Sequence, residues 1–233
     1  MWDNPRLLNA AAGFLVGLAL FAFAAAGLRV ALRSPLFPVR SVEVLTPLRH
    51  APREAIERAV QRQLDGNFFG ARIGELRRAL EQVPWVRRAE VRRVWPDRLE
   101  VSLEEHVALA RWAAGGAVNT HGERFDGTAG DDLPLFAGPE GSEAELAARY
   151  PRFARLVEPL GAPLERLVLT PRYAWQLRLA NGLSLVLGRD ADVAEKRLER
   201  FVAAYEQTVA QLPGRHDYVD LRYANGFAVR VKG

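Results

Sequence analysis

The chain has 233 residues, of which 49% are apolar and 26% charged, and its formal net charge is +4 at pH 7. This composition excludes a disordered tail and a membrane protein with many spans, and the length suffices for one or two domains with their own cores. Cysteine is absent from the sequence, which excludes disulfides, thiolate metal sites and cysteine nucleophiles. Every basic residue except Lys196 and Lys232 is arginine, and the arginines alternate with acids. That pattern is typical of a mixed solvated surface and not of a face that binds nucleic acid.

One segment near the N-terminus is long and apolar enough to cross a membrane. From Leu7 to Leu28 there are 22 residues without a charge, bounded by Arg6 and Arg29. As a helix this segment is about 33 Å long at 1.5 Å per residue, which matches a hydrocarbon core of about 30 Å. No other stretch is comparably long and apolar. We therefore predict a single-pass protein whose remaining residues lie on one side of the membrane.

A cleaved signal peptide is the alternative interpretation of this segment. It contains small residues that suit a cleavage site: Ala22, Ala24, Ala25 and Ala26. The apolar core of a signal peptide is usually about 7–15 residues long, so the length favours an anchor. The flanking charges are nearly balanced, with Arg6 before the segment and Arg29 and Arg33 after it. The positive-inside rule by itself therefore leaves the orientation open.

After a proline-containing linker at residues 30–38, the pattern predicts a small α+β domain over residues 39–107. Its predicted elements are a strand from residue 39, helices at 52–66 and 73–82, and strands at 85–95 and 99–107. The helices show apolar residues at helical spacing, and the strands alternate apolar with polar residues. Pro96 and Asp97 suit the turn between the last two strands. This order predicts helices packed on one face of a sheet.

Residues 108–233 predict a second domain, a mostly antiparallel β sheet with flanking helices. Its predicted elements are a hairpin at 117–125, a helix at 142–160, a strand at 164–170, a hairpin at 173–187, a helix at 191–212 and a last hairpin at 218–231. Ser142 and Glu145 fit a capping box at the start of the first helix. Asn181-Gly182 fits a type I′ turn, and Asn225-Gly226 marks the turn of the last hairpin.

The sequence shows no catalytic or metal-binding pattern. Its four histidines are far apart and belong to no HExxH motif, and neither GxSxG nor a phosphate loop occurs: His50, His106, His121 and His216. The two polar clusters are predicted to be turn chemistry: His121, Glu123 and Asp126, and Asp131-Asp132. We expect Trp85 and Trp95 to pack in the core or in turns. The sequence therefore predicts no enzyme, no metal and no cofactor.

Several short motifs follow one another along the chain at characteristic spacing. They are Val83–Val86, Val94–Leu99, Glu105–Trp112, Leu133–Phe136, Gly138–Gly141, Trp175–Leu177 and Tyr218–Tyr223. Together they resemble the FtsQ/DivIB family of bacterial cell division proteins, in its proteobacterial branch. The resemblance covers nearly the whole chain, and it depends on the order of the motifs more than on any one of them.

The resemblance implies a cytoplasmic tail at 1–6, a transmembrane helix at 7–29, a POTRA module at 39–107 and a distal β domain at 108–233. The bulk of the chain would lie in the periplasm, anchored in the inner membrane. It also implies a non-catalytic scaffold whose distal domain binds FtsB and FtsL, which bear on septal peptidoglycan synthesis. Other division proteins would bind through the POTRA module and the membrane helix.

The resemblance further implies that FtsB adds a strand to the sheet edge formed by the last hairpin. The residues mapped to that edge are Arg222, Tyr223, Asn225, Gly226 and Phe227, with Arg172 on the neighbouring strand. An edge strand has free N–H and C=O groups, and arginine suits partner carboxylates. The alternative is that Tyr223 packs in the sheet and both arginines are merely solvated.

Two other functions remain open from the sequence. A POTRA-bearing secretion or outer-membrane assembly factor would usually carry repeated POTRA modules or a β-barrel, and the sequence shows neither pattern. An envelope enzyme acting on cell-wall material would need an acid–base pair, which the sequence does not display.

Overall fold

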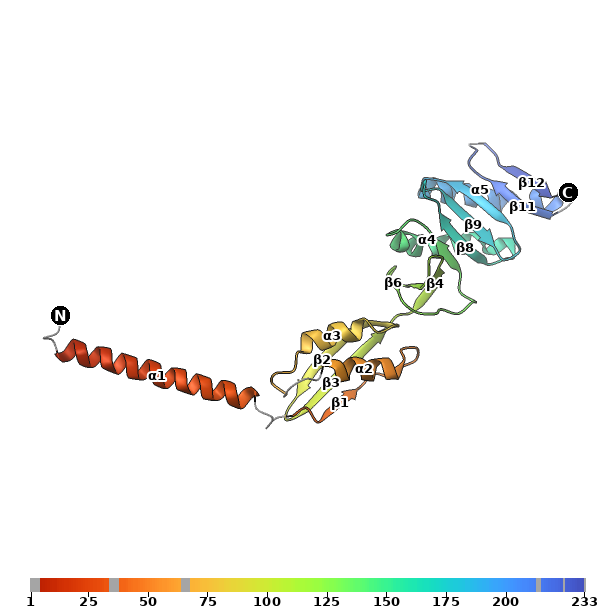
Figure 1. Cartoon of the computed structure of the whole chain (residues 1–233). Coiled ribbons are helices and arrows are strands. Elements are labelled where there is room, and N and C mark those ends of the chain that lie inside the picture. The colour runs from red at the N-terminus through yellow and green to blue at the C-terminus, as the bar shows by residue number, and fades with distance from the viewer. Residues whose placement is uncertain (1–4, 34–37, 64–67, 213–214, 224, 233) are drawn as a thin grey trace. The chain divides into compact units, whose positions relative to one another are not determined.

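The structure is a computed structural model that describes residues 5–33, 38–63, 68–212, 215–223 and 225–232 (Figure 1). The chain divides between Glu105 and His106 into two compact units, the first of which includes the N-terminal helix. Parts of the predicted tail at 1–6 and of the predicted linker at 30–38 lie outside the described residues, as does Gly66, the predicted stop of a helix.

Helix α1 (Pro5–Arg33) contains the apolar segment and is a candidate membrane span. None of the span Asn9–Val30 is buried inside the structure, and its large side chains are exposed on all sides, Phe23 to 82%. An apolar helix without protein around it needs another apolar medium, which a bilayer provides. The helix continues to Arg33, so residues 30–33 belong to it and not to the predicted linker.

The first domain has the predicted order of strand, helix, helix, strand, strand. Its elements are β1 (Ser41–Val44), α2 (Arg53–Gln63), α3 (Ile73–Glu81), β2 (Val86–Val94) and β3 (Arg98–Glu105). The sheet order is β1-β3-β2, with β1 parallel and β2 antiparallel to β3. The central strand β3 directs Leu99, Val101 and Leu103 into the core formed with the two helices. The other sheet face carries cross-strand ion pairs, such as Arg92 with Glu100.

The last residue of β3, Glu105, is held by the loop before α2. Its carboxylate accepts the backbone N–H groups of Arg49, His50 and Ala51 at 2.9–3.3 Å. Burial alone would raise the pKa of Glu105, but the hydrogen bonds from Ala51, His50 and Arg49 outweigh it, so the pKa lies below its ordinary value. These bonds fasten the strand that leads into the second unit.

Replacing Glu105 with glutamine is expected to destabilise the first domain by about 1 kcal/mol at neutral pH, because charge-assisted hydrogen bonds become neutral ones. The folded-state pKa lies below that of the unfolded chain. The carboxylate therefore stabilises the fold fully above the unfolded pKa, and this contribution is lost as pH falls through the folded pKa. Hydrogen exchange of first-domain amides should show the two proteins converging in acid. A difference in stability between the two proteins that stays constant over pH would mean that the shape of the side chain, and not its charge, causes the loss.

The two tryptophans of the first domain have different surroundings. Trp85 is half-buried and stacks on His50, with ring centroids 4.5 Å apart, as expected for packing in a turn. Trp95, at the tip of the β2–β3 hairpin, is 76% exposed. The expectation of core or turn packing is therefore wrong for Trp95, because nothing among the described residues covers most of its ring.

The second domain is a nine-stranded mixed sheet with two long helices. Its elements are β4 (Ala108–Trp112), β5 (Ala117–Asn119), β6 (Arg124–Phe125), β7 (Leu135–Ala137), α4 (Glu143–Val157), β8 (Leu164–Leu169), β9 (Trp175–Leu179), β10 (Ser184–Gly188), α5 (Ala191–Tyr205), β11 (Arg215–Asp220) and β12 (Ala228–Lys232). Short 3-10 helices, Glu158–Leu160 and Val209–Gln211, follow α4 and α5. The sheet order is β12-β11-β10-β9-β8-β7-β4-β5-β6. The pairs β10–β11, β7–β8 and β4–β7 are parallel, and the other pairs are antiparallel, as predicted for most of the sheet.

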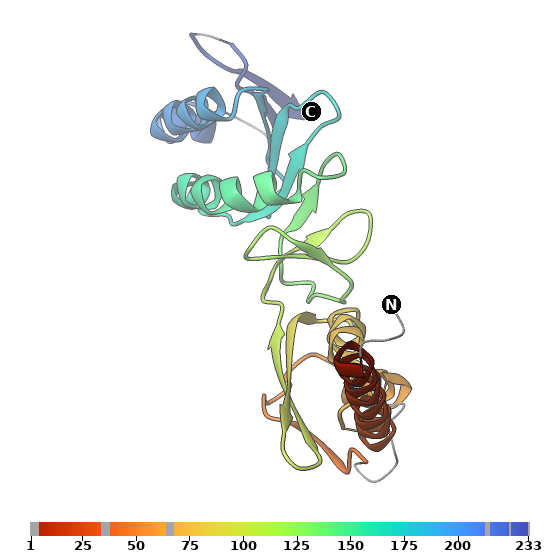
Figure 2. The same ribbon diagram turned by 90° about the vertical axis from the view of Figure 1, so that its left-hand side faces the viewer.

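Helices α4 and α5 lie side by side on one face of this sheet (Figures 1 and 2). Between the helices and the sheet lies an aromatic core in which Phe153 contacts Trp175, with ring centroids 5.4 Å apart. The helices are also joined by a buried carboxylate. The carboxylate of Glu195 in α5 accepts a hydrogen bond from Arg149 of α4 at 2.9 Å. It also forms an ion pair with Arg152, one turn further along α4.

Three local predictions for this domain are wrong. Ser142 forms no capping box, because its hydroxyl donates to the carbonyl oxygen of Pro139 instead. The helix predicted to reach residue 212 ends at Tyr205. At the β9–β10 turn only Gly182 has positive φ (91°), and Leu179 donates its N–H to Leu183. The turn is therefore a three-residue loop with a glycine bulge and not type I′, which needs two positive φ angles.

Candidate partner-binding edge

Strand β12 is an outer strand of the nine-stranded sheet and pairs with β11. The orientation of the β11 backbone follows from one hydrogen bond, in which Leu221 donates its N–H to Val186 of β10 at 2.8 Å. Successive residues of a strand direct their N–H and C=O groups to alternate sides. The backbone N–H and C=O groups of Asp220 and Tyr218 therefore face β12.

This alternation decides which groups of β12 are free. Ala228 is opposite Asp220, and Arg230 is opposite Tyr218, so these two residues form the hydrogen-bonded pairs with β11. Val229 lies between them and directs its N–H and C=O away from the sheet. Among the described residues no strand pairs with this side of β12. The edge thus offers a donor and an acceptor for an incoming strand.

Three connections lie at one end of the sheet, next to the start of β12. Trp175 at the start of β9 is opposite both Leu169 of β8 and Gly188 of β10, and β11 runs parallel to β10. The β8–β9 turn, the loop from β10 to α5 and the β11–β12 connection are therefore neighbours. We call this part of the domain the sheet end.

Arg172 lies in the β8–β9 turn and not on a strand next to the last hairpin, so that part of the prediction is wrong. From this turn to the β11–β12 connection there are three strand spacings, about 14 Å at 4.8 Å each. Arg172 is nevertheless exposed at the same sheet end as Arg222. The two guanidinium groups are thus separate positive points on one surface.

Arg222 is tied to a buried carboxylate of its own domain. Its Nη2 and Nε donate to Asp220 at 2.6 and 2.9 Å, and its backbone N–H donates to the same group at 3.0 Å. The Arg222 hydrogen bond lowers the pKa of Asp220 against the opposing effect of burial, and Arg197 adds a smaller electrostatic contribution. Arg222 is therefore pre-oriented, and only its remaining N–H groups are available to a partner carboxylate.

The other predicted residues of the last hairpin fall into two classes. Tyr223 is 57% exposed, and Asn225 and Gly226 are also exposed. Phe227 points inward and packs edge-on against Phe201, with ring centroids 5.2 Å apart. Strand β11 ends at Asp220 and β12 begins at Ala228, so the connection between them is longer than a tight Asn-Gly turn. Tyr223 belongs to the exposed surface, whereas Phe227 fixes the start of β12 to the core.

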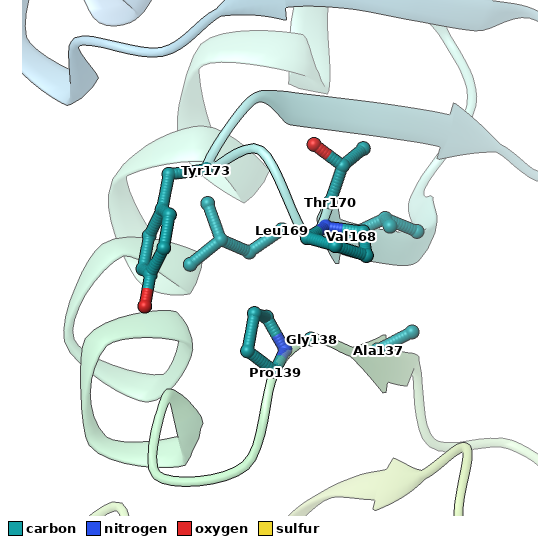
Figure 3. A pocket seen from close by; sticks show the side chains of 8 residues that line it. Ala137, Gly138, Pro139, Val168, Leu169, Thr170 and Tyr173 are labelled. Atoms are coloured by element: carbon teal, nitrogen blue, oxygen red, sulfur yellow. The ribbon is translucent and has the colours of Figure 1, made fainter.

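A pocket beside Arg172 was not predicted from the sequence (Figure 3). Its volume is about 360 Å³, and its lining is mostly apolar: Ala137, Gly138, Pro139, Val168, Leu169, Thr170, Pro171 and Tyr173. Tyr173 adopts φ 57°, uncommon for a residue other than glycine, and is 58% exposed. Thr170 stabilises this turn, since its hydroxyl accepts the N–H of Ala174 at 3.0 Å. The only local signal was proline within a short turn, which does not reveal a cavity.

Comparison with known proteins identifies both domains. Residues 37–106 match the family model described as POTRA domain, FtsQ-type, and residues 110–222 match that of the C-terminal part of cell division protein FtsQ/DivIB. The chain belongs to the FtsQ/DivIB family. Cell division protein FtsQ of Burkholderia pseudomallei is 42% identical over 100% of this chain and 95% of its own length. The FtsQ proteins of Nitrosospira multiformis and Bordetella pertussis are 40% and 39% identical, over 99% of this chain and 99% and 93% of their own lengths.

Family membership favours cell division over secretion or outer-membrane assembly. It confirms the POTRA module and the overall α+β organisation. The match to the C-terminal family model ends at residue 222, two residues after the end of β11. The assignment of Tyr223 and β12 to a partner surface therefore depends on the geometry of the edge.

The polar clusters of the second domain form turns. The side-chain oxygen of Asn119 accepts hydrogen bonds from the backbone N–H groups of His121 and Glu123, at 2.9 and 2.8 Å, and so closes the β5–β6 turn. Asp131 pairs with Arg111 at 2.9 Å. In the ranges that the structure describes, no group of three His, Asp or Glu residues could hold a metal ion.

Proposed function

We propose that this member of the FtsQ/DivIB family is a single-pass scaffold of the division complex in the inner membrane. Its N-terminus would lie in the cytoplasm and both domains in the periplasm. The second domain would bind FtsB at β12, and FtsL with it, and so link earlier division proteins to septal peptidoglycan synthesis. Those earlier proteins would bind the POTRA domain and the membrane helix.

The outward N–H and C=O groups of Val229 are the observation that carries this proposal. An edge strand with free backbone groups is suited to strand addition, in which main-chain hydrogen bonds give affinity and side chains give specificity. Phe227 and its contact with Phe201 hold the start of β12 in place before a partner arrives. A pre-organised edge reduces the ordering cost of binding.

The sheet end indicates the chemistry of the partner segment. Arg172 and the remaining N–H groups of Arg222 suit two carboxylates at separate points of the partner, since the backbones of the two connections lie about 14 Å apart, or three strand spacings. Tyr223 offers a large exposed ring, and the pocket beside Arg172 suits one apolar side chain. We therefore expect the bound part of FtsB to be extended, acidic and to carry an apolar anchor.

The test is a titration of residues 34–233 with the extracytoplasmic segment of FtsB from the same organism. Arg172→Ala and Tyr223→Ala are each expected to weaken binding at least about tenfold, or 1.4 kcal/mol. Arg166→Ala is the matched control, because Arg166 is an exposed arginine within β8, away from the sheet end. Absence of binding by the folded fragment, or an equal loss with Arg166→Ala, would contradict the proposal.

A further inference from the structure

The two ends of the first-domain sheet are attached to different parts of the chain. Strands β1 and β3 are parallel and start at one end, where β2 stops. This end, the basal end, therefore carries the start of β1 and the tip of the β2–β3 hairpin. The Arg40 N–H donates to Asp97 at 2.9 Å and joins the two. At the opposite end, Glu105 leads into the second unit.

Two large aromatic side chains are exposed at the basal end. Trp95 at the hairpin tip is 76% exposed, and Phe69 in the loop before α3 is 42% exposed. Arg93 near the end of β2 holds that loop in place, since it donates to Phe68 at 3.0 Å and to Ala71 at 2.6 Å. Tryptophan is enriched where a membrane meets water, because its ring is apolar and its N–H is polar.

The basal end also carries more positive than negative charge. Arg40 pairs with Asp97, and Arg98 pairs with Glu43, each at 3.5 Å with both groups largely or partly exposed. Such exposed pairs are weak and leave arginine N–H groups free for other anions. Arg93 donates to backbone carbonyl oxygens, which do not neutralise its charge. These groups suit the phosphates of lipid headgroups.

The covalent chain keeps the basal end near the bilayer that α1 spans. Arg33 ends α1, three residues beyond the apolar span that stops at Val30. Arg40 follows seven residues later and so lies at most about 25 Å from Arg33. A short tether corresponds to an effective concentration in the millimolar range, so a weak contact becomes well populated.

We propose that the basal end of the first domain lies on the bilayer surface, with Trp95 in the interfacial layer and Arg40, Arg93 and Arg98 facing lipid phosphates. This inference requires that α1 spans the membrane, but it is independent of any partner at β12. Such a contact would restrict the orientation of the first domain relative to the membrane plane.

The test uses the full chain with Trp2→Phe in phosphatidylcholine nanodiscs whose acyl chains are either plain or brominated near the glycerol. The difference in emission between this protein and its Trp95→Phe derivative isolates the fluorescence of Trp95. Bromine quenches indole on contact, so we expect this emission to be at least about twofold weaker in brominated discs. Trp95→Phe should fold normally, because the side chain is mostly exposed.

Trp85 at the opposite end of the same sheet is the matched control, and its emission, isolated in the same way with Trp85→Phe, should not respond to bromine. If Trp95 responds no more than Trp85 in a chain that co-purifies with the discs, the inference is overturned while the membrane anchor stands. A basal end reserved for a protein partner would give this result. A chain that fails to enter the discs would overturn both the anchor and the inference.

Discussion

Val229→Pro is expected to weaken the proposed binding of the FtsB segment by at least about 30-fold, or 2 kcal/mol, while the second domain stays folded. Proline removes the one backbone N–H that this residue directs away from β11, and its ring occupies the path of the incoming strand. The β11–β12 hydrogen bonds involve Ala228 and Arg230 and are untouched, and edge strands tolerate proline at such positions. Titration calorimetry with residues 34–233 would measure the loss.

Two further variants separate the backbone from the side chain. Val229→Ala removes the same packing against the core but keeps the N–H, so its affinity should stay within about threefold of the original. Ala228→Pro removes an N–H directed at β11 and should loosen the edge strand itself, seen as faster hydrogen exchange in β11. If Val229→Ala weakened binding as much as Val229→Pro, strand addition at this edge would be refuted.

Trp175→Ala is expected to lower the free energy of unfolding of the second domain by about 3–5 kcal/mol, the usual cost of emptying an aromatic core site. The side chain is 1% exposed and packs against Phe153 of α4. Its backbone, at the start of β9, is opposite both β8 and β10, so the loss extends to the turn that carries Arg172. Urea unfolding of residues 34–233, followed through second-domain amides, would measure the change.

Trp95→Ala provides the contrast with a tryptophan at the surface. With 76% of its surface exposed, Trp95 fills no cavity, and its removal should change stability by no more than about 0.5 kcal/mol. Similar losses for the two variants would mean that the packing around Trp175 is looser than the structure indicates.

Local patterns sufficed for much of this protein. An uncharged run bounded by Arg6 and Arg29 predicted the long apolar helix α1, a candidate membrane span whose length matches the thickness of a bilayer. Alternating Leu99, Val101 and Leu103 predicted strand β3 and its buried face, although not its central place in the sheet. Order and spacing of short motifs then identified the family, which the comparisons confirmed.

Only the tertiary structure decided which residues share a surface. Sequence alternation predicts that β12 is a strand, but it does not show which way the N–H and C=O groups of Val229 point. That depends on the parallel pairing of β11 with β10, two strands that are connected through helix α5. The same sheet order places Arg172 in a turn about 14 Å from the last hairpin, three strand spacings away. It also brings buried Asp220 under Arg222 and leaves Trp95 uncovered. Pairing between distant strands and the packing around each side chain set these features, and no local spacing of residues encodes them.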